Sequence, residues 1–538
     1  MKLVTVAEMR QIEQETDARG WTYEQMMQAA GTGLAHVVAE RLARDARRSV
    51  VGLVGSGNNG GDTLVALTEL LRLGWQATAY LARPRPQDPL VERFARNGGW
   101  VLTVEDDPHL HTLRRVIAEH DVLLDGLLGT GIHLPLREHA ARVLAAAKEA
   151  VAQAATAVVA VDVPSGIDCD TGEAAPETLR ADLTVTMAAA KVGMIHLPAL
   201  SLVGEVVVVD IGVPDDLPAW QHVQRYWADA ALVRGVLPPR PPDAHKGTFG
   251  TALVVAGSVN FTGAALLAGE AAYRSGAGLV TLAVPAPLHP ALAGQFPEAT
   301  WVLLPHEMGV IAEGAADVVR QALTPRVTAL LLGPGFGQEP PTAAFLARLL
   351  AAAPKNRGSL GFVPPAAEEK AASSPLPPLV VDADGLKLLT RLENWPQHLP
   401  APAVLTPHPG EMSVLTGLPR ADIQADRLGV AERFAREWGH VVVLKGASTV
   451  VAAPDGRVAV IPVATPALAR AGTGDVLAGI IVGLRAQRVP PWEAAVAGAW
   501  LHAKAGLLAW EGMGTSAAVL AGDVLAALPD VLAALGYR

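Results

Sequence analysis

Short Val-rich runs alternate with longer Ala-, Leu- and Arg-rich stretches along most of this chain. Residues 50–54, 157–161 and 205–209 are such runs, and a comparable series continues from residue 251 to residue 531. Two parallel strands need a long crossover between them, and a helix is the usual one. Alternation of this kind is therefore typical of a parallel sheet flanked by helices, and it predicts an α/β protein.

A proline-rich segment divides this alternation into two series. At 538 residues the chain is longer than one ordinary domain, and the segment 214–242 is the best linker candidate. We therefore predict two three-layer αβα domains, at 1–215 and 243–538, joined by a Pro-rich linker at 216–242. The stretch 354–378 is rich in Ala, Glu, Ser and Pro, and we interpret it as a mobile surface insertion.

The composition argues against several classes of protein. The formal net charge of -10 does not suit general binding to nucleic acid. No uninterrupted apolar stretch reaches the roughly 18 residues of a membrane-spanning helix, and the early charges of Lys2 and Glu8 do not fit a secretory signal. The one cysteine, Cys169, cannot form an intrachain disulfide, which suits a reducing compartment. We expect a cytoplasmic protein that acts on small molecules, without a nucleic acid or membrane partner.

The most informative local motif lies near the C-terminal end. Gly472-Thr-Gly-Asp475 follows a strand-like run and opens a long apolar helix. Small residues there let backbone N–H groups converge at the helix N-terminus, where the helix dipole also favours negative charge. Asp475 would repel a phosphate unless it takes a proton or positions an oxygen. We interpret the motif as a phosphate-binding loop that carries a general base, the alternative being an ordinary helix cap.

A second glycine-rich loop lies at the other end of the chain. The sequence Gly-Ser-Gly-Asn-Asn-Gly-Gly-Asp occupies residues 55–62, after the apolar run 50–54 and before a helical pattern. It therefore also has the order strand, loop and helix N-terminus. Two phosphate-binding loops this far apart predict two sites on two domains.

Polar side chains follow three predicted strands of the N-terminal half. Asn59, Asp125 and Ser165 all lie in such loops, and α/β proteins bind ligands at the carboxyl ends of their strands. One carboxylate with neutral oxygen donors suits a monovalent cation. The alternative interpretation makes these residues turn formers and local caps.

Two further elements of these loops bear on chemistry. The backbone of Gly129-Thr-Gly131 offers a cradle for a pyrophosphate. Asp162 stands at a predicted strand end and is the best acid–base candidate, with Lys191 as a possible assistant.

These N-terminal motifs resemble those of the NAD(P)H-hydrate epimerase family over about 1–215. The motifs are Asn-Asn-Gly-Gly-Asp at 58–62, Asp-x-Leu-x-Gly-Thr-Gly at 125–131, Asp-x-Pro-Ser-Gly-x-Asp at 162–168 and Thr-Met-Ala-Ala-x-Lys at 186–191. The resemblance implies a Rossmann-like domain that interconverts the R and S epimers of hydrated NADH and NADPH.

The same resemblance implies roles for individual residues. Potassium would bind to Asn59, Asp125 and Ser165, and Asp162 would be catalytic. The sequence departs from the usual pattern at Thr63, where the family has Gly, and at Ala190, where it has Pro. The implied hydrate-binding residues are Asn58, Asn59, Gly60, Gly61, Asp62, Gly129, Thr130, Gly131, Ile132, His133, Leu134, Pro135 and Asp162.

The C-terminal half resembles the ribokinase-like NAD(P)H-hydrate dehydratase family over about 235–538. The resemblance rests on an ordered series of motifs, among which the combination of His-Pro-Gly-Glu at 408–411 with Gly-Thr-Gly-Asp at 472–475 is the most specific. A sugar or vitamin kinase shares the second motif but not the combination. Arg470 departs from the family pattern just before the glycine loop.

This second resemblance implies a dehydratase that uses ADP with Mg²⁺. Asp475 would be the general base that activates the substrate hydroxyl for phosphorylation, and elimination of phosphate would then restore NADH or NADPH. The implied hydrate contacts are Ala264, Gly335, His408 and Asp475, and the implied nucleotide contacts are Lys445, Gly446, Ala447, Ser448, Thr449 and Gly474.

Other polar residues receive ordinary interpretations. Asp382 and Asp384 fit a strand-end turn, and Cys169 lacks a histidine partner pattern. We expect core or surface roles for His133, His196, His306 and His502.

Together the two halves predict a homo-oligomeric bifunctional repair enzyme, with NADHX, NADPHX and ADP as its small-molecule partners, which releases AMP and phosphate. Two alternatives stay open. The C-terminal half could be a small-molecule kinase, and the N-terminal half could be only a nucleotide-binding or oligomerisation module.

Overall fold

The computed structural model describes residues 1–43, 48–351 and 376–537, in two compact units at 1–227 and 228–538. The unit boundary falls inside the segment predicted as a linker, which contains α7 (Pro218–His222), β10 (Arg225–Trp227) and α8 (Ala230–Val236). Nearly all of the predicted insertion at 354–378 lies outside the described residues.

The first unit is built on a parallel sheet with the strand order β4-β3-β2-β5-β6-β7-β9. The chain therefore starts in the middle of the sheet, builds one half outward and then crosses back to build the other. This doubly wound order is the Rossmann-like arrangement predicted from sequence. The strands are β2 (Ser49–Val54), β3 (Gln76–Leu81), β4 (Trp100–Thr103), β5 (Val122–Gly126), β6 (Ala157–Val161), β7 (Leu183–Met187) and β9 (Glu205–Val209).

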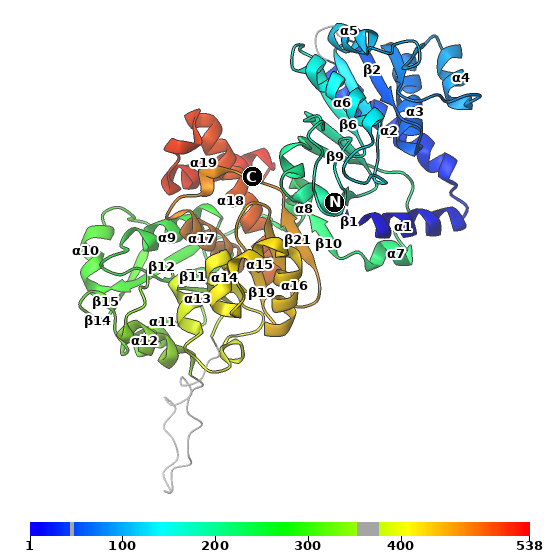
Figure 1. Cartoon of the computed structure of the whole chain (residues 1–538). Coiled ribbons are helices and arrows are strands. Elements are labelled where there is room, and N and C mark those ends of the chain that lie inside the picture. The colour runs from blue at the N-terminus through cyan, green and yellow to red at the C-terminus, as the bar shows by residue number, and fades with distance from the viewer. Residues whose placement is uncertain (44–47, 352–375, 538) are drawn as a thin grey trace, which may run out of the picture. The chain divides into compact units, whose positions relative to one another are not determined.

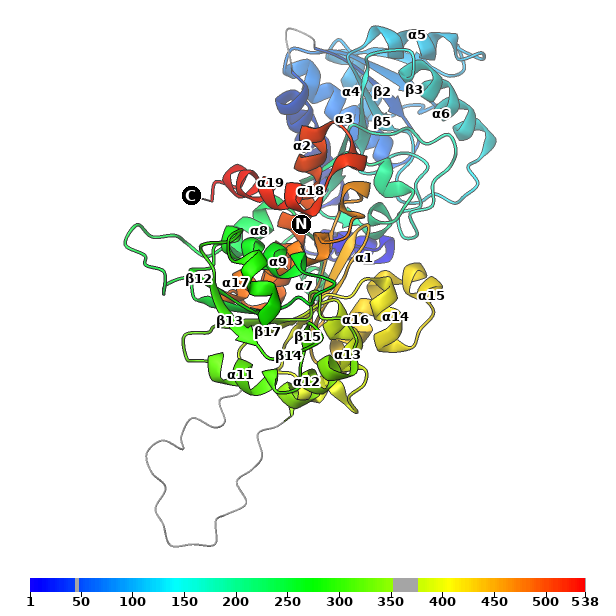
Figure 2. The same cartoon turned by 90° about the vertical axis from the view of Figure 1, so that its left-hand side faces the viewer.

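Helices cover both faces of this sheet (Figure 2). In β2, Val50 and Val54 pack toward α2 (Tyr23–Leu42) and α3 (Asn58–Arg72), whereas Val51 and Leu53 pack toward α5 (His111–Glu119) and α6 (Glu138–Val151). Alternate residues of a strand face opposite sides, so a strand that is apolar throughout forms two cores. The sheet therefore lies between two layers of helices. Helix α4 (Pro89–Arg96) also belongs to this unit.

The N-terminal segment adds a small second sheet to this unit. β1 (Leu3–Val4) pairs in parallel with β8 (Ala190–Lys191), and α1 (Val6–Ala18) follows β1 directly. Thr5 caps α1 by accepting a hydrogen bond from the Glu8 backbone N–H, while the Glu8 carboxylate accepts one from the Thr5 N–H. This reciprocal capping box fixes where the helix begins.

The second unit contains a mixed sheet, which runs β21-β20-β19-β18-β17-β16-β11-β12-β13. The pairs from β19 to β13 are parallel, whereas β20 and β21 pair antiparallel at one end. The strands are β11 (Thr251–Val255), β12 (Leu279–Pro285), β13 (Thr300–Leu304), β16 (Ala329–Leu332), β17 (Leu379–Val381), β18 (Val404–Leu405), β19 (Val441–Leu444), β20 (Thr449–Ala452) and β21 (Val458–Ile461), with a separate hairpin of β14 (His306–Glu307) and β15 (Val310–Ile311).

This sheet is also enclosed by helices, as Figure 1 shows for α9 and α17 on one face and α11 and α12 on the other. The predicted three-layer αβα arrangement is thus confirmed for both units. The helices are α9 (Gly263–Arg274), α10 (His289–Leu292), α11 (Ala315–Ala322), α12 (Pro340–Leu350), α13 (Asp384–Leu389), α14 (Pro409–Thr416), α15 (Arg420–Ala425), α16 (Arg427–Trp438), α17 (Thr473–Ala486), α18 (Pro491–Met513) and α19 (Ala521–Ala534). Among the described helices, none combines the length and apolarity that crossing a membrane requires.

Candidate active sites

The first candidate site lies where β2, β5 and β6 end. These three strands are neighbours in the sheet, so the loops that follow them meet at one edge. The strand order reverses between β2 and β5, which is the point where doubly wound sheets bind ligands. The predicted convergence of the three loops is therefore present in the fold.

The Asn-Asn-Gly-Gly-Asp motif forms the N-terminus of α3. The N-cap residue Gly57 makes no side-chain cap bond, so the first N–H groups of the helix stay open to an anion. Gly60 packs closely, because a Cβ there would lie 2.1 Å from the Gly55 carbonyl oxygen. Arg85 holds this loop by donating to the carbonyls of Gly55 at 2.6 Å and Gly57 at 3.2 Å. Arg85 therefore fixes the backbone of the loop that leads into α3, and we call this loop the cradle.

Thr63 does not enter this cradle. Its side chain is fully buried and donates a hydrogen bond to the Asn59 carbonyl at 2.8 Å. It packs against two glycines of the sheet, where a Cβ at Gly126 would lie 1.8 Å from Thr63 Oγ1 and a Cβ at Gly52 would lie 2.8 Å from its Cγ2. The threonine that replaces the usual glycine therefore fills space beneath the helix and leaves its N-terminus open.

The loop at 129–135 borders the cradle on the next strand. A Cβ at Gly129 would lie 3.3 Å from the Cβ of Asn59, so the two backbone loops are neighbours. Thr130, Ile132 and Leu134 are partly buried, whereas Gly131, His133 and Pro135 are exposed.

Of the three predicted cation ligands, Asn59 and Ser165 meet at the Leu128 carbonyl, and Asp125 is hydrogen-bonded to Ser165. Ser165 donates through its N–H and its Oγ to the Asp125 carboxylate, at 2.8 and 2.6 Å. The Leu128 carbonyl accepts from Asn59 Nδ2 at 2.8 Å and from Ser165 Oγ at 3.3 Å. Asp125 is fully buried, and no ion pair reaches it within the described ranges. Burial raises its pKa despite the hydrogen bonds from Ser165, and a lone buried carboxylate among neutral oxygens fits a monovalent cation.

Asp162 holds an unusual backbone position directly after β6. Its φ is 66°, in the left-handed region that non-glycine residues rarely adopt. Its carboxylate accepts from Thr186 Oγ1 at 3.0 Å, from the Met187 N–H at 3.0 Å and from Lys191 Nζ. The Lys191 side chain is 1% exposed and that of Asp162 is 13% exposed. The buried ammonium thus pairs with Asp162, and the acid–base roles expected of the two residues stay predictions.

Two more carboxyl groups interact electrostatically with this pair. Burial, with the charges of Asp162 and Glu13, raises the pKa of Asp62 well above its usual value. Burial likewise raises the pKa of Glu13, against the opposing effect of Lys191. A carboxyl that keeps its proton beside one that is paired with a lysine gives the site an acid and a base. Glu13 was not identified from the sequence.

The second candidate site lies at the N-terminus of α17. Gly472 is the N-cap residue with φ 88°, and it makes no side-chain cap bond, which leaves the first N–H groups of the helix open. Asp475 lies in the first turn. Burial raises its pKa to about 7, with further contributions from the Asp382 charge, against the opposing effect of Lys445. A carboxyl with this pKa can accept a proton at neutral pH and release it again.

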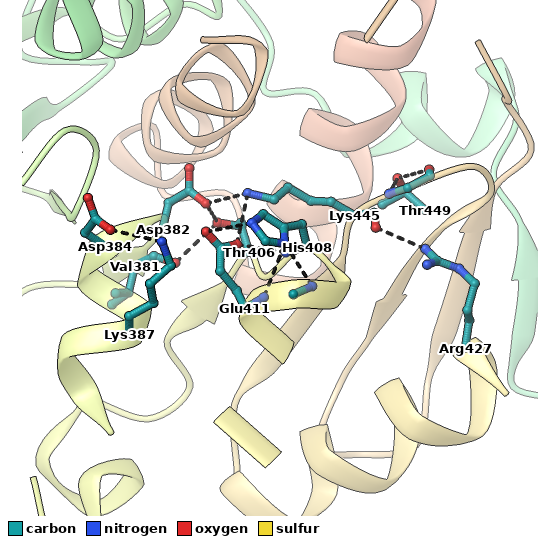
Figure 3. Close-up of polar contacts among 12 residues, drawn as sticks. Val381, Asp382, Asp384, Lys387, Thr406, His408, Glu411, Arg427, Lys445 and Thr449 are labelled. Carbon is teal, nitrogen blue, oxygen red and sulfur yellow. Dashed lines mark hydrogen bonds and ion pairs between the residues drawn. The ribbon is translucent and has the colours of Figure 1, made fainter. Parts of the chain in front are cut away.

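Lys445 lies at the centre of a charged network (Figure 3). Its Nζ is 2.7 Å from Asp382 Oδ1 and 3.7 Å from Glu411 Oε2, and Asp382 also accepts from Thr406 Oγ1 at 2.7 Å. Burial alone would lower the pKa of Lys445, but the Asp382 and Glu411 charges raise it above its usual value. The ammonium lies 3.5 Å from the place of a Cβ at Gly474, so a fixed positive charge faces the helix start.

His408 caps α14 from beside this network. Its Nδ1 accepts from the N–H groups of Gly410 at 2.9 Å and Glu411 at 3.2 Å, and the Glu411 carboxylate accepts from the His408 N–H at 2.9 Å. Burial lowers the pKa of His408, although Glu411 pulls the other way. The ring is therefore neutral near pH 7, with its proton on Nε2, from which it can donate to a substrate oxygen.

The loop from Lys445 to Thr449 lines a cavity of about 460 Å³. Arg427 holds the loop by donating to the carbonyls of Leu444 at 2.9 Å and Lys445 at 3.2 Å (Figure 3). Thr449 Oγ1 donates back to the Gly446 carbonyl at 2.9 Å. The cavity is also lined by His408, Pro409, Arg470, Thr473, Gly474, Leu477, His502 and several aliphatic residues. Ser448 belongs to the loop and has φ 51°.

The remaining predicted hydrate contacts form a pair. Gly335 has φ 65°, and a Cβ there would lie 2.8 Å from the Cβ of Ala264 near the start of α9. The two residues therefore lie side by side, and their contact with the hydrate stays a prediction.

Sequence reasoning missed three members of this site. Asp382 and Glu411 flank Lys445. The sequence indicates only a strand-end turn for Asp382. His502 had been assigned to a core or surface role, and it lines the cavity with a buried Nε2 that has no hydrogen-bond partner in the described part of the chain. Burial lowers its pKa to about 4. No local pattern in the sequence around His502 distinguishes it from an ordinary core histidine.

Divalent metal ions are usually held by groups of His, Cys, Asp or Glu side chains. In the parts of the chain that the structure describes, no group of three or more His, Cys, Asp or Glu side chains is placed to hold a metal ion. Mg²⁺ usually binds through one or two carboxylates together with substrate phosphates, and the carboxylates around Lys445 fit that mode of binding.

Comparison with known proteins gives matches over both units. Residues 252–530 match the family model described as NAD(P)H-hydrate dehydratase, and residues 23–193 match that of the YjeF-related protein N-terminus. A solved Bacillus subtilis structure, an ADP/ATP-dependent NAD(P)H-hydrate dehydratase co-crystallised with ATP and Mg²⁺, is 31% identical, covers 58% of this chain and 98% of its own, and has a TM-score of 0.47.

Relatives also match along almost the entire chain. A bifunctional NAD(P)H-hydrate repair enzyme of Moorella thermoacetica is 37% identical over 541 residues, which cover 99% of this chain and 97% of that protein. A protein of the same name from Salinibacter ruber is 37% identical over 493 residues, which cover 88% and 85%. This chain therefore belongs to the family of bifunctional NAD(P)H-hydrate repair enzymes.

Proposed function

We propose that the first unit interconverts the R and S epimers of hydrated NADH and NADPH, and that the second dehydrates the S epimer with ADP. The observation that carries the proposal is the start of α17, where a carboxyl with a pKa of about 7 stands beside a fixed ammonium and an uncapped helix N-terminus. These are the parts that phosphoryl transfer to a hydroxyl requires.

In the dehydratase, Asp475 takes the proton of the ring hydroxyl. The freed oxygen attacks the terminal phosphorus of ADP, so one O–P bond forms and the bond to the leaving AMP breaks. Phosphate then leaves the ring with its oxygen, and loss of a proton from the neighbouring carbon restores the double bond. Water is a poor leaving group, whereas phosphate is a good one. The products are AMP, phosphate and NADH or NADPH.

The surrounding residues neutralise and orient the reacting groups. Lys445 and the N–H groups at Gly474 stabilise the charge on the transferring phosphoryl group. The loop from Gly446 to Thr449 binds the AMP part of the nucleotide, and His408 contacts the hydrate. Gly335 and Ala264 pack against each other and contact the hydrate. Asp382 would help to hold a Mg²⁺ ion bound with the nucleotide, and the ion would supply positive charge to offset that of the phosphates.

In the epimerase, the chemistry is proton transfer at both faces of one carbon. An acid protonates the hydroxyl, the C–O bond breaks with help from the ring nitrogen, and water adds to the opposite face while a base takes its proton. We assign Asp62 as the acid, which its pKa, raised well above the usual value by burial, supports. Asp162, paired with Lys191, is placed to act as the base. The α3 N-terminus and the loop 129–135 bind the dinucleotide's phosphates.

Potassium would complete this unit. Asn59, Asp125 and Ser165 fit a monovalent cation by their oxygen donors and by the uncompensated charge of the buried Asp125. The ion would offset that charge and fix the loops on which the phosphates rest. The homo-oligomer and the cytoplasmic location expected from sequence stay predictions.

The test uses a mixture of both NADHX epimers with Mg²⁺, and with ADP or ATP in parallel. Near-ultraviolet absorbance reports the return of NADH. Recovery with ADP that continues beyond the S fraction supports both activities, because the R fraction must then have been epimerised. Recovery that stops at the S fraction removes the epimerase from the proposal. A stable phosphorylated product without NADH would instead favour the small-molecule kinase.

A further inference from the structure

The N-terminal segment that leads into helix α1 is anchored beside Lys191, the lysine that pairs with Asp162. β1 pairs with β8 so that Val4 stands opposite Lys191. The Ala190 N–H donates to the Lys2 carbonyl at 3.1 Å, a bond that the usual proline could not make at this position. Ala190 therefore adds a hydrogen bond that ties the start of α1 to the site.

The charged residues of α1 fall into two groups. Glu8 pairs with Arg225, and Glu15 accepts hydrogen bonds from two neighbours, so both have structural partners. Arg10 and Glu13 make no hydrogen bond and no close ion pair with any residue that the structure describes. They are three positions apart, which places them on one face of the helix.

That face is turned toward the epimerase site. Arg10 Nη2 lies 3.9 Å from the place of a Cβ at Gly131, within the predicted phosphate loop. Glu13 is partly buried and interacts electrostatically with Lys191 and Asp162. One helix thus brings a cation to the phosphate end of the site and a carboxyl to its acid–base end.

The proposed reaction leaves a task for such a carboxyl. After one inversion Asp62 has lost a proton and Asp162 has gained one, so the pair is set for the reverse direction only. Another turnover in the same direction requires that the proton be moved back. A partly buried group that interacts with both carboxyls and is accessible to water can carry it.

We propose that α1 completes the epimerase site, with Glu13 returning the proton between Asp162 and Asp62 after each turnover and Arg10 binding a phosphate of the dinucleotide at Gly131. The inference rests on the epimerase activity proposed above. No proton is gained or lost overall, since the step only restores the starting protonation of the two aspartates.

The decisive variant is Glu13→Gln, which keeps the shape of the side chain and removes its ability to carry a proton. With enzyme in excess over (R)-NADHX and without ADP, a single inversion should proceed at the wild-type rate. With substrate in excess, the steady rate should fall on the order of 100-fold. Epimer ratios after quenching, resolved by chromatography, measure both. A merely structural role would slow the single inversion as well.

Three controls make the outcome clear. Glu15→Gln on the same helix should behave as wild type, and Glu13→Asp should recover much of the steady rate because it keeps a carboxyl. Dehydration of (S)-NADHX by the second unit should be unchanged in every variant. An unchanged steady rate in Glu13→Gln, or an equal loss in both regimes, would overturn the relay. If the wild-type protein does not epimerise NADHX, the proposed epimerase function itself would be contradicted.

Arg10→Gln tests the phosphate contact. We expect the KM for NADHX in epimerisation to rise about tenfold with little change in kcat, since a charge-assisted bond to a phosphate is lost in ground state and transition state alike. The exposed Arg19→Gln on the same segment is the matched control. An unchanged KM would remove Arg10 from the site.

Discussion

The two candidate sites use the same kind of helix start in different electrostatic surroundings. Both α3 and α17 begin in a glycine-rich loop without a side-chain cap, and each has an aspartate with a raised pKa near its start. In the second unit Lys445 stands at the helix start, 17% exposed and facing the cavity. In the first unit Lys191 is 1% exposed and paired with Asp162.

This difference matches the chemistry proposed for each site. Phosphoryl transfer develops charge on the phosphate itself, so the cation is needed at the helix start. Inversion at a carbon leaves the phosphates unchanged and needs an acid and a base, so the lysine is better placed beside the carboxylate proposed as the base than at the helix start. In the proposed functions, the N–H groups at the start of α17 therefore face a reacting phosphate, whereas those at the start of α3 bind phosphates that do not react.

The largest expected effect comes from Asp475→Asn. An amide cannot take the proton of the hydroxyl, so ADP-dependent dehydration of (S)-NADHX should fall on the order of 1000-fold. Epimerisation should be unchanged, and ADP should still bind when measured by calorimetry. A dehydration rate within tenfold of wild type would remove Asp475 as the base.

Asp162→Asn is the reciprocal variant and should lower epimerisation on the order of 100-fold while dehydration continues. Lys191 would lose its charged partner, so a melting scan should accompany the kinetics. Should epimerisation survive with normal stability, the first unit would be better explained as a binding module.

The pH dependence of dehydration tests Asp475 as the base. Asp475 must be deprotonated to act as a base, and its pKa is about 7. The kcat/KM for (S)-NADHX should therefore fall about tenfold per pH unit on the acid side of that value and level off above it. Direct ADP titrations at each pH show whether nucleotide binding contributes. A profile that is flat through neutrality would contradict the assignment.

Paired glycine substitutions sharpen the comparison of the two loops. Gly60→Ala forces a Cβ to within 2.1 Å of the Gly55 carbonyl, so it should destabilise the first unit by about 2 kcal/mol or more. Gly474→Ala meets nothing closer than 3.5 Å and should leave the melting temperature unchanged, yet weaken ADP binding several-fold by crowding the phosphate. Equal effects on stability would show that the second loop is as tightly packed as the first.

Much of this arrangement could be predicted from local sequence patterns. The alternation of Val-rich runs and helical stretches predicted the α/β units, and glycine-rich loops between strand and helix predicted both helix starts. The meeting of Asn59, Asp125 and Ser165 also followed, because neighbouring parallel strands end at one edge. The roles given to these residues stay predictions.

The remainder depends on packing between distant segments. Lys445 is 63 positions from Asp382, and only the order of β17, β18 and β19 brings them together. Glu13 reaches its site through the pairing of β1 with β8, two short strands at opposite ends of the first unit's sequence. The antiparallel end strands β20 and β21 likewise carry no pattern that distinguishes them from parallel ones.

The packing beneath α3 has a genetic consequence. Thr63 occupies the space that Gly126 and Gly52 leave empty, so the three positions cannot vary independently. Gly126→Ala alone should disrupt the unit, whereas Gly126→Ala combined with Thr63→Gly leaves the Leu53 carbonyl, at 3.1 Å, as the nearest obstacle. The double variant should therefore be more stable than the single one. The effect of Thr63→Gly would then depend on the residue at position 126, which is sign epistasis. Homologues could exchange the Thr63 and Gly126 pair for a glycine and alanine pair only through a particular order of substitutions.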